Sequence, residues 1–241
     1  MSEREFDRYS ASYDELLKDP IRDYFSGAES TFFHLRKRDL ICEYFERRRL
    51  NTHDMSYLDL GCGRGELLRV LRPHFAQAIG CDPSPGMLDA AEGIETHVQP
   101  DENTIPFADS RFDFITAAAV YHHVALENRQ KLAREVSRVL KPGGIFAIIE
   151  HNPFNPVTRL IVSRTPVDQD AVLLKPAESV TLLRSAGLRV DGPYYFLYFP
   201  MRLYERGGKF IEKLLTKLPL GGQYMVFGSK PAAPAEARRQ A

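Results

Sequence analysis

The sequence contains no tryptophan and only three cysteines, and its charges cancel, with 32 Lys and Arg residues against 32 Asp and Glu residues. Cys42, Cys62 and Cys81 are too few and too scattered for a disulfide framework or a zinc site. We therefore expect a metal-independent protein in a reducing, cytoplasmic setting. The lack of net positive charge argues against broad nucleic-acid binding.

Long apolar runs are missing as well. No stretch reaches the roughly 18 consecutive apolar residues of a membrane-spanning helix, and the opening segment MSEREFDRYS has no apolar targeting core. We expect no stable membrane insertion, which leaves peripheral contact with a membrane open. The chain has 44% apolar and 27% charged residues, which is the usage of a soluble globular protein.

The spacing of apolar residues predicts three segments. Residues 1–50 carry apolar positions at intervals of three and four, which indicates helices with a break at Asp19-Pro20. Over residues 51–230, short apolar runs alternate with helical patterns. This alternation is typical of βαβ crossovers and of a doubly wound, mostly parallel α/β sheet covered on both faces. Residues 231–241 are rich in proline and alanine and are expected to form a disordered tail.

The most informative stretch is Leu58–Glu66, in which a buried strand leads into three glycines and then a helix. Glycines at such a turn let the backbone bend sharply and approach a small molecule where a Cβ would collide. The pattern G-x-G-x-G has Glu66 where a dinucleotide fingerprint has its last glycine, and it lacks the Lys-Ser/Thr ending of a phosphate-binding loop. Asp82 ends the second strand about 20 residues after Gly61, where a carboxylate can accept both ribose hydroxyl protons of a nucleoside.

These residues resemble the class I S-adenosylmethionine-dependent methyltransferase family, whose first motif reads LDLGCGxG and whose second strand ends in an acidic residue. The resemblance is strong over residues 58–151 and includes the LKPGG segment at residues 140–144. It implies a Rossmann-like fold with a seven-stranded sheet, S-adenosyl-L-methionine as cofactor and S-adenosyl-L-homocysteine as product. A plainer interpretation is that Asp82 only caps the helix that follows it.

The resemblance also implies positions around the methionine and ribose parts of the cofactor. Asp59 would orient the glycine loop and approach the ammonium group, with Gly61 and Gly63 beside the amino acid and the sugar. Asp82 would bind the ribose hydroxyls, and Met87 would lie against the adenine ring.

Residues 101–107, DENTIPF, resemble the family's D-A-E-x-L-P-F passage. The resemblance implies that Asp101 accepts from the adenine amino group and that the main-chain N–H of Glu102 contacts the ring. The family usually has alanine at the position of Glu102, so the resemblance gives its side chain no role. Ala118 and Ala119, at the end of the fourth strand, would leave room beneath the sulfonium.

The N-terminal segment FDRYSASYD resembles a lid that the family often folds over the cofactor, which makes Tyr13 a predicted cofactor contact. The same aromatic spacing also suits a simple packing face. Residues 194–202 form the densest aromatic run of the chain. They predict either a buried strand or, with the basic helix at 208–218, a wall for an aromatic or lipid-like acceptor.

Two histidines are the candidates for the chemistry. His122 follows the fourth strand and His151 ends the fifth, so both are expected at the sheet edge where ligands of parallel sheets gather. A histidine near its ordinary pKa can remove a hydroxyl proton near neutral pH. The resemblance places His122 where some O-methyltransferases of the family have their base. Alternatively, His123 is a structural hydrogen-bonding residue and His151 only shapes a proline-rich turn with Asn155.

We therefore expect an enzyme that methylates a small, hydrophobic or aromatic metabolite, with oxygen favoured over carbon or nitrogen. Asn152-Pro153-Phe154 is similar to the tetrapeptide of base-amino methyltransferases, but it lacks the second proline and follows the fifth strand, which disfavours nucleic acid. One alternative is a pericyclase or decarboxylase that uses the sulfonium only as a fixed charge. Another is a non-enzymatic partner protein with the same fold. Glu66 disfavours a nicotinamide enzyme.

Overall fold

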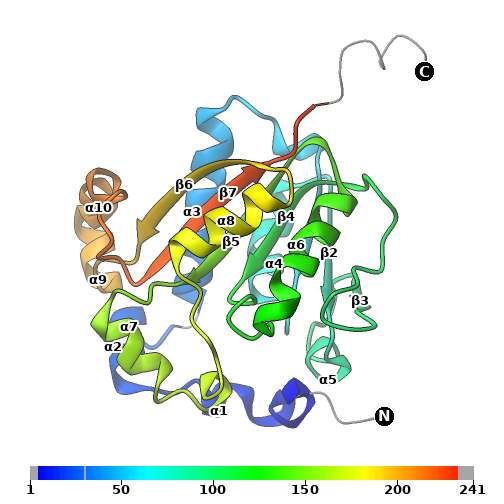
Figure 1. The fold of residues 1–241 in the computed structure, drawn as a ribbon. Helices are drawn as coiled ribbons and strands as arrows, with labels where there is room; N and C mark the ends of the chain where they lie inside the picture. Colours follow the sequence, from blue (N-terminus) through cyan, green and yellow to red (C-terminus); the bar gives the residue numbers. More distant parts are fainter. Residues whose placement is uncertain (1–4, 30, 233–241) are drawn as a thin grey trace, which may run out of the picture.

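The computed structural model describes residues 5–29 and 31–232. At its centre is a seven-stranded sheet in the order β3-β2-β1-β4-β5-β7-β6 (Figure 1). β7 runs antiparallel to β5 and β6, and the other neighbouring strands are parallel. The strands are β1 (Ser56–Leu60), β2 (Gln77–Asp82), β3 (Thr96–Val98), β4 (Phe112–Ala118), β5 (Leu140–His151), β6 (Arg189–Phe196) and β7 (Gln223–Ser229). The predicted doubly wound, mostly parallel Rossmann-like fold is confirmed.

Helices and turns surround this sheet. The α-helices are α1 (Tyr13–Leu16), α2 (Pro20–Ser26), α3 (Thr31–Arg47), α4 (Glu66–Leu71), α5 (Pro85–Leu88), α6 (Leu126–Val139), α7 (Pro156–Val162), α8 (Pro176–Ser185), α9 (Met201–Leu203) and α10 (Lys209–Leu215). Short 3₁₀ turns are η1 (Glu5–Arg8), η2 (Ser10–Ser12), η3 (Thr52–Asp54), η4 (Arg72–His74) and η5 (Pro166–Asp168), and η6 (Tyr204–Gly208) is a π-helical turn.

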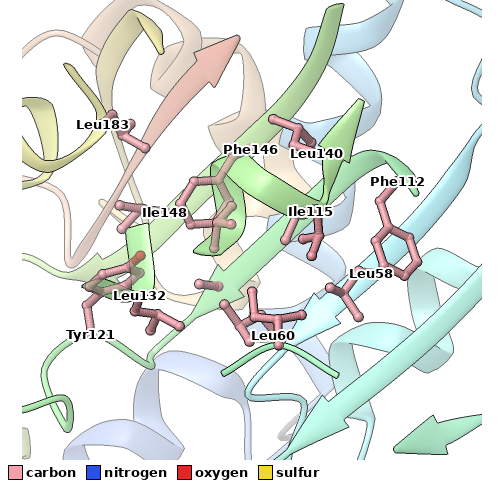
Figure 2. Packing of buried hydrophobic residues seen from close by; sticks show 14 of the residues in the cluster. Leu58, Leu60, Phe112, Ile115, Tyr121, Leu132, Leu140, Phe146, Ile148 and Leu183 are labelled. Atoms are coloured by element: carbon pink, nitrogen blue, oxygen red, sulfur yellow. The ribbon is translucent and has the colours of Figure 1, made fainter. Parts of the chain in front are cut away.

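The core is split by the sheet into two apolar layers. Alternate residues of β1 pack into different layers. Leu58 and Leu60 face the layer that α6 and α8 cover, and Tyr57 faces the layer that α3 and α4 cover. Figure 2 shows Leu58 and Leu60 in the first layer, with Leu132 of α6 and Leu183 of α8. Because both faces are covered, β1 is buried along almost its whole length, and its apolar residues Tyr57, Leu58 and Leu60 explain the strand signal in the sequence.

The N-terminal part is less regular than the predicted helices. Between residues 5 and 16 the chain forms η1, η2 and the short α1. The predicted break at Asp19-Pro20 is the start of α2: Asp19 Oδ1 accepts from the main-chain N–H groups of Ile21 and Arg22, and proline occupies the first helical position. Residues 1–4 and 30 of the predicted N-terminal segment 1–50 lie outside the described residues, and the division at residue 50 stays a prediction.

Beyond β5 the chain adds α7, which the sequence prediction lacks. Asn155 caps this helix, with Oδ1 accepting from the main-chain N–H of Thr158, and Pro156 follows it. The LKPGG segment ends α6 as expected, but it also opens β5, where Leu140 pairs with Phe112 before the register shifts. The predicted disordered tail lies outside the described residues from residue 233 onward. No helix of the described part is both long and apolar enough to cross a membrane.

Candidate active site

A cavity of about 960 Å³ lies at the carboxyl ends of the parallel strands. Its volume is near the upper end of the range for ligand pockets, about 300–1,000 Å³. The lining includes every residue that the sequence predicts for the site, namely Tyr13, Asp59, Gly61, Gly63, Asp82, Met87, Asp101, Glu102, Ala118, His122 and His151. The fold therefore brings the predicted site residues together around one cavity.

The glycine loop after β1 forms one wall of the cavity. Gly61 and Gly63 have φ angles of +65° and +51°, in the left-handed region that favours glycine. A Cβ on Gly61 would lie 2.5 Å from Cγ2 of Val120, so the loop after β4 leaves no room for a side chain there. The main-chain N–H of Gly61 also donates to the carbonyl of Cys81 at 2.8 Å, which ties the loop to β2.

Asp82 ends β2 and holds the glycine loop by hydrogen bonding. Its Oδ2 accepts from the main-chain N–H of Gly63 at 2.9 Å, and its Oδ1 accepts from that of Ser84 at 2.8 Å. The helix α5 has Ser84 as its N-cap, with Oγ accepting from the main-chain N–H of Met87. The cap of α5 is therefore Ser84, which leaves Asp82 at the loop and the cavity.

The N-terminal segment is bound to the same region by side chains. Oδ1 of Asp7 accepts from Oγ of Ser84 at 2.5 Å and from the main-chain N–H of Gly86 at 3.0 Å. Asp14 forms an ion pair of 2.7 Å with Arg64 in the glycine loop. These contacts hold η1 and α1 beside α5 and the loop, at the rim of the cavity.

Asp59 and Lys37 place opposite charges on the cavity wall. Asp59, on β1, accepts a hydrogen bond of 2.6 Å from Oγ1 of Thr116, and burial raises its pKa to about 7. Lys37, on α3, is only 6% exposed. Burial lowers the pKa of Lys37 to about 8, although the carboxylates of Asp59 and Glu150 act in the other direction. A zwitterionic amino-acid group fits such a pair, with its ammonium toward Asp59 and its carboxylate toward Lys37.

Asp101 and Glu102 are exposed residues of the loop after β3. The carboxylate of Asp101 already shapes its own turn, since it accepts from the main-chain N–H of Asn103 and from Oγ1 of Thr104.

Met87 is buried on α5 and lines the cavity. Burial raises the pKa of the Tyr13 hydroxyl well above its ordinary value.

Two alanines close the end of β4. Ala119 has a φ of +60°, which is unusual for a residue with a Cβ, and its main-chain N–H donates to the carbonyl of Ile149 at 2.8 Å. A left-handed alanine costs about 1–2 kcal/mol. The sharp turn at Ala118-Ala119 directs the following residues along the cavity wall, which includes His122 and His123.

Glu150 organises the loop that carries His122. Its Oε1 accepts from the main-chain N–H groups of Val120 and Tyr121 at 3.1 and 2.8 Å, and its Oε2 lies 2.5 Å from Nδ1 of His122. Burial disfavours the charged form of His122, but Glu150 and Asp168 outweigh it and raise the pKa of His122 to about 9. Despite its burial, the pKa of Glu150 is lowered by the neighbouring imidazole.

The Nε2 side of His122 faces a second carboxylate. Asp168, from η5, has Oδ1 3.5 Å from Nε2 of His122 and 3.4 Å from Nε2 of His123. The ring of His151 lies 5.3 Å from that of His122, between centroids, and burial together with His122 lowers the pKa of His151 to about 4. His123 also packs edge-on against Phe6 of η1, at 4.9 Å between centroids.

Several ionisable residues of the site are absent from the sequence prediction, among them Lys37, Glu150 and Asp168. Glu150 could have been identified as a site residue from the sequence, because it is a carboxylate at the end of an apolar run. Lys37 lies in the run Arg36-Lys37-Arg38, which has the pattern of a solvated helix face. Asp168 follows no pattern, since only the fold of the loop after α7 brings it to the histidines.

The comparisons concern the family and the fold. Residues 58–148 match the family model described as methyltransferase domain. The uncharacterized methyltransferase sll0829 of Synechocystis sp. is 36% identical over 102 residues, which are 41% of this chain and 48% of that protein. The ubiquinone biosynthesis O-methyltransferase of Methylobacterium nodulans is 27% identical over 252 residues, with 95% of this chain and 94% of that protein covered.

A solved structure extends the likeness to the fold. A SAM-dependent methyltransferase of Thermotoga maritima superimposes with a TM-score of 0.66 and 16% identity, over 93% of this chain and 97% of that one. This chain spans about half the length of the Synechocystis relative, so the two share the matched region. That region carries the glycine loop, Asp59 and Asp82. Residues 58–148 are therefore similar to the methyltransferase domain family, and the fold is that of S-adenosylmethionine-dependent methyltransferases, which supports S-adenosyl-L-methionine as the cofactor.

Proposed function

We propose that this protein transfers the methyl group of S-adenosyl-L-methionine to a hydroxyl oxygen of a small, hydrophobic or aromatic molecule. The observation that carries the proposal is that one cavity holds both the glycine loop with Asp82 and two buried histidines, His122 and His151, at the ends of neighbouring strands. The first set suits an adenosine-containing cofactor, and the second suits an acceptor that must lose a proton.

The cofactor, when bound, supplies a methyl group on a positively charged sulfur. In our proposal Asp59 binds its ammonium, Lys37 its carboxylate and Asp82 its ribose hydroxyls. Met87, Asp101 and Glu102 contact the adenine, and Tyr13 closes the cavity from the N-terminal segment. Fixing the reactants and excluding water are the main contributions that a protein makes to such a displacement.

The acceptor is proposed to be apolar because apolar side chains from α7 and from the end of β6 line the same cavity. These are Val157, Ile161, Leu197 and Tyr198. Of the aromatic run 194–202, only Leu197 and Tyr198 line the cavity, while Tyr195 and Phe196 are buried in the sheet. The run is therefore mainly a core strand, and its last residues supply part of the wall.

Oxygen is favoured as the methylated atom on two grounds. The relative that aligns with 95% of the chain is named as an O-methyltransferase. In addition, His151, which burial keeps neutral by lowering its pKa to about 4, lies beside His122 and is placed to accept the proton that a hydroxyl group releases as its oxygen bonds to the methyl carbon. We propose a cytoplasmic location, since a reducing compartment suits the free thiols of Cys42, Cys62 and Cys81.

The test is to incubate the protein with methyl-labelled S-adenosyl-L-methionine and a metabolite extract, and to follow the label by mass spectrometry. We expect one labelled small molecule and an equal amount of S-adenosyl-L-homocysteine. Label found only in protein or RNA would contradict a small-molecule acceptor. A new product of unchanged mass without S-adenosyl-L-homocysteine would indicate a non-methylating catalyst. Absence of binding to either nucleoside in calorimetry would indicate a non-enzymatic protein.

A further inference from the structure

Three side chains from two separate loops converge on one point of the cavity wall. They are His122 and His123 after β4, and Asp168 in η5. One ligand atom from each lies within 4.8 Å of the others, and Nε2 of both histidines is near Oδ1 of Asp168. Imidazole nitrogen and carboxylate oxygen are common ligands of first-row divalent metals.

The distances do not suit direct hydrogen bonding. A charge-assisted bond between an imidazolium and a carboxylate is about 2.7–2.9 Å long. Here Oδ1 of Asp168 lies 3.5 Å from Nε2 of His122 and 3.4 Å from Nε2 of His123. Nε2 of His122 is buried and makes no hydrogen bond within the described part of the chain.

The same distances suit ligands that share one ion. Zinc bonds to histidine nitrogen and carboxylate oxygen are about 2.0–2.2 Å long, and in a tetrahedral site they separate neighbouring ligand atoms by roughly 3.4 Å. Both distances to Asp168 have this value. A buried histidine nitrogen without a hydrogen bond, directed at a carboxylate, is the arrangement that a metal ion would complete.

Glu150 supports this use of His122. It lies 2.5 Å from Nδ1 of the ring and so fixes Nε2 toward Asp168. Histidines that bind metals almost always donate their other ring N–H to a carboxylate, a carbonyl or water, which sets the tautomer and the ring orientation. The carboxylate of Glu150 is itself fixed by two main-chain N–H groups.

We propose that His122, His123 and Asp168 bind one first-row divalent transition-metal ion, with Zn²⁺ as the representative, in the wall of the acceptor cavity. Three protein ligands leave a fourth position for water or for the acceptor oxygen, as in catalytic zinc sites. The role of the ion rests on the proposed function: it binds the acceptor hydroxyl and favours loss of its proton. His151 then remains as the proton acceptor. This inference departs from the metal-independent enzyme that the sequence predicts.

The experiment measures metal binding alone, with neither cofactor nor acceptor present. The full chain is treated with a chelator, dialysed and titrated with Zn²⁺ in a calorimeter. We expect one equivalent to bind, and binding at least 10-fold weaker in Asp168→Asn and in His123→Gln. Mg²⁺, which prefers oxygen ligands, should bind at least 100-fold more weakly than Zn²⁺.

Two controls separate this site from adventitious binding. Asp170→Asn makes the same charge change in the same loop at an exposed residue, and His97→Gln removes an exposed histidine that pairs with Glu95. Both should bind Zn²⁺ as the wild type does. Failure of the wild type to bind, or equal binding by Asp168→Asn and His123→Gln, would overturn the proposal, as would loss of binding in His97→Gln.

Folding is checked by circular dichroism and by binding of S-adenosyl-L-homocysteine. If either ligand variant does not fold, wild-type crystals soaked in Zn²⁺ decide the matter by anomalous scattering. A peak between the three side chains supports the site, and a peak elsewhere or none rejects it. Since no methyl transfer is measured, failure of the proposed function would leave the metal result intact.

Discussion

The carboxylate of Glu150 binds the ring of His122 through Oε2 and, through Oε1, the main chain of the loop that carries this ring. One side chain of β5 therefore fixes both the position and the rotation of a histidine that follows β4. Glu150 and His122 are 1% and 2% exposed, so neither group can turn to water if the other is lost. The pair is a structural requirement of the site before any ligand binds.

Glu150→Gln should therefore destabilise the protein by about 3 kcal/mol, because removal of one partner of a buried charged pair leaves the other uncompensated. Urea denaturation followed by circular dichroism measures the free energy of unfolding. Glu135→Gln is the matched control, since Glu135 also accepts from a main-chain N–H and binds an arginine but is partly exposed. We expect a loss of under about 1 kcal/mol there. Equal losses in the two variants would contradict the role of Glu150.

Asp82→Asn should weaken binding of S-adenosyl-L-homocysteine by about 10- to 100-fold. The carboxylate accepts from Gly63 and Ser84 with different oxygens, and an amide keeps only one of these acceptors. The loop then shifts, and the proposed bonds to the ribose hydroxyls weaken. Calorimetry gives the dissociation constant, with Asp89→Asn, an exposed residue just after α5, as the control. Unchanged affinity in Asp82→Asn would remove this residue from the cofactor site.

The sheet and the cofactor side of the cavity were predictable because local patterns determine them. β1 is buried on both faces, the glycines after it need left-handed backbone, and Asp82 directly ends the next strand. Each of these signals spans only a few residues. The helix α7 had a signal of the same kind in Asn155-Pro156, an N-cap followed by proline, which we interpreted as a turn.

The acceptor side was less predictable because its residues meet only through long-range packing. Asp168 comes from a loop more than 40 positions after His122, and nothing near it in the sequence marks it. The position of Lys37 in the cavity could not be predicted either, since its neighbours Arg36 and Arg38 suggest an exposed helix face. In the structure Arg36 instead pairs with buried Glu212 and α3 packs against the sheet, which turns Lys37 into the cavity.

Gly61→Ala should destabilise the protein by about 3 kcal/mol and abolish cofactor binding. Part of this loss is the left-handed backbone, which costs an alanine about 1–2 kcal/mol, and the rest is the collision of the new Cβ with Val120. Gly93→Ala separates the two effects, because Gly93 has a similar φ of +72° with nothing within 4 Å of its Cβ position. We expect Gly93→Ala to lose only the backbone part. A Gly61→Ala protein no less stable than Gly93→Ala would show that Val120 moves aside freely.

Lys37→Met should make the protein more stable and yet weaken its binding of the cofactor. The pKa of Lys37 is about 8 in the folded protein and 10.5 ordinarily, so the unfolded chain binds more protons between these values. The contribution of this group to the free energy of unfolding is therefore greatest above pH 10.5. It falls as the pH falls from 10.5 to 8 and is lost below pH 8. Removal of the ammonium should stabilise the protein at pH 7 by on the order of 3 kcal/mol. Lys131→Met, at an exposed position, should leave stability unchanged.

The affinity for S-adenosyl-L-homocysteine should depend on pH through Lys37 and Asp59. The nearby charges of Glu150, Arg22 and Glu66 act on the pKa of Lys37, and that of Glu66 also acts on the pKa of Asp59. Above about pH 8 Lys37 loses the charge that we assign to the cofactor carboxylate, and below about pH 7 Asp59 loses the charge that we assign to the ammonium. Affinity is therefore expected to be highest between these values. Lys37→Met should bind at least 10-fold more weakly, lose the alkaline decline and keep the acid one in calorimetry from pH 6 to 9. If the alkaline decline persists in Lys37→Met, another group binds the carboxylate.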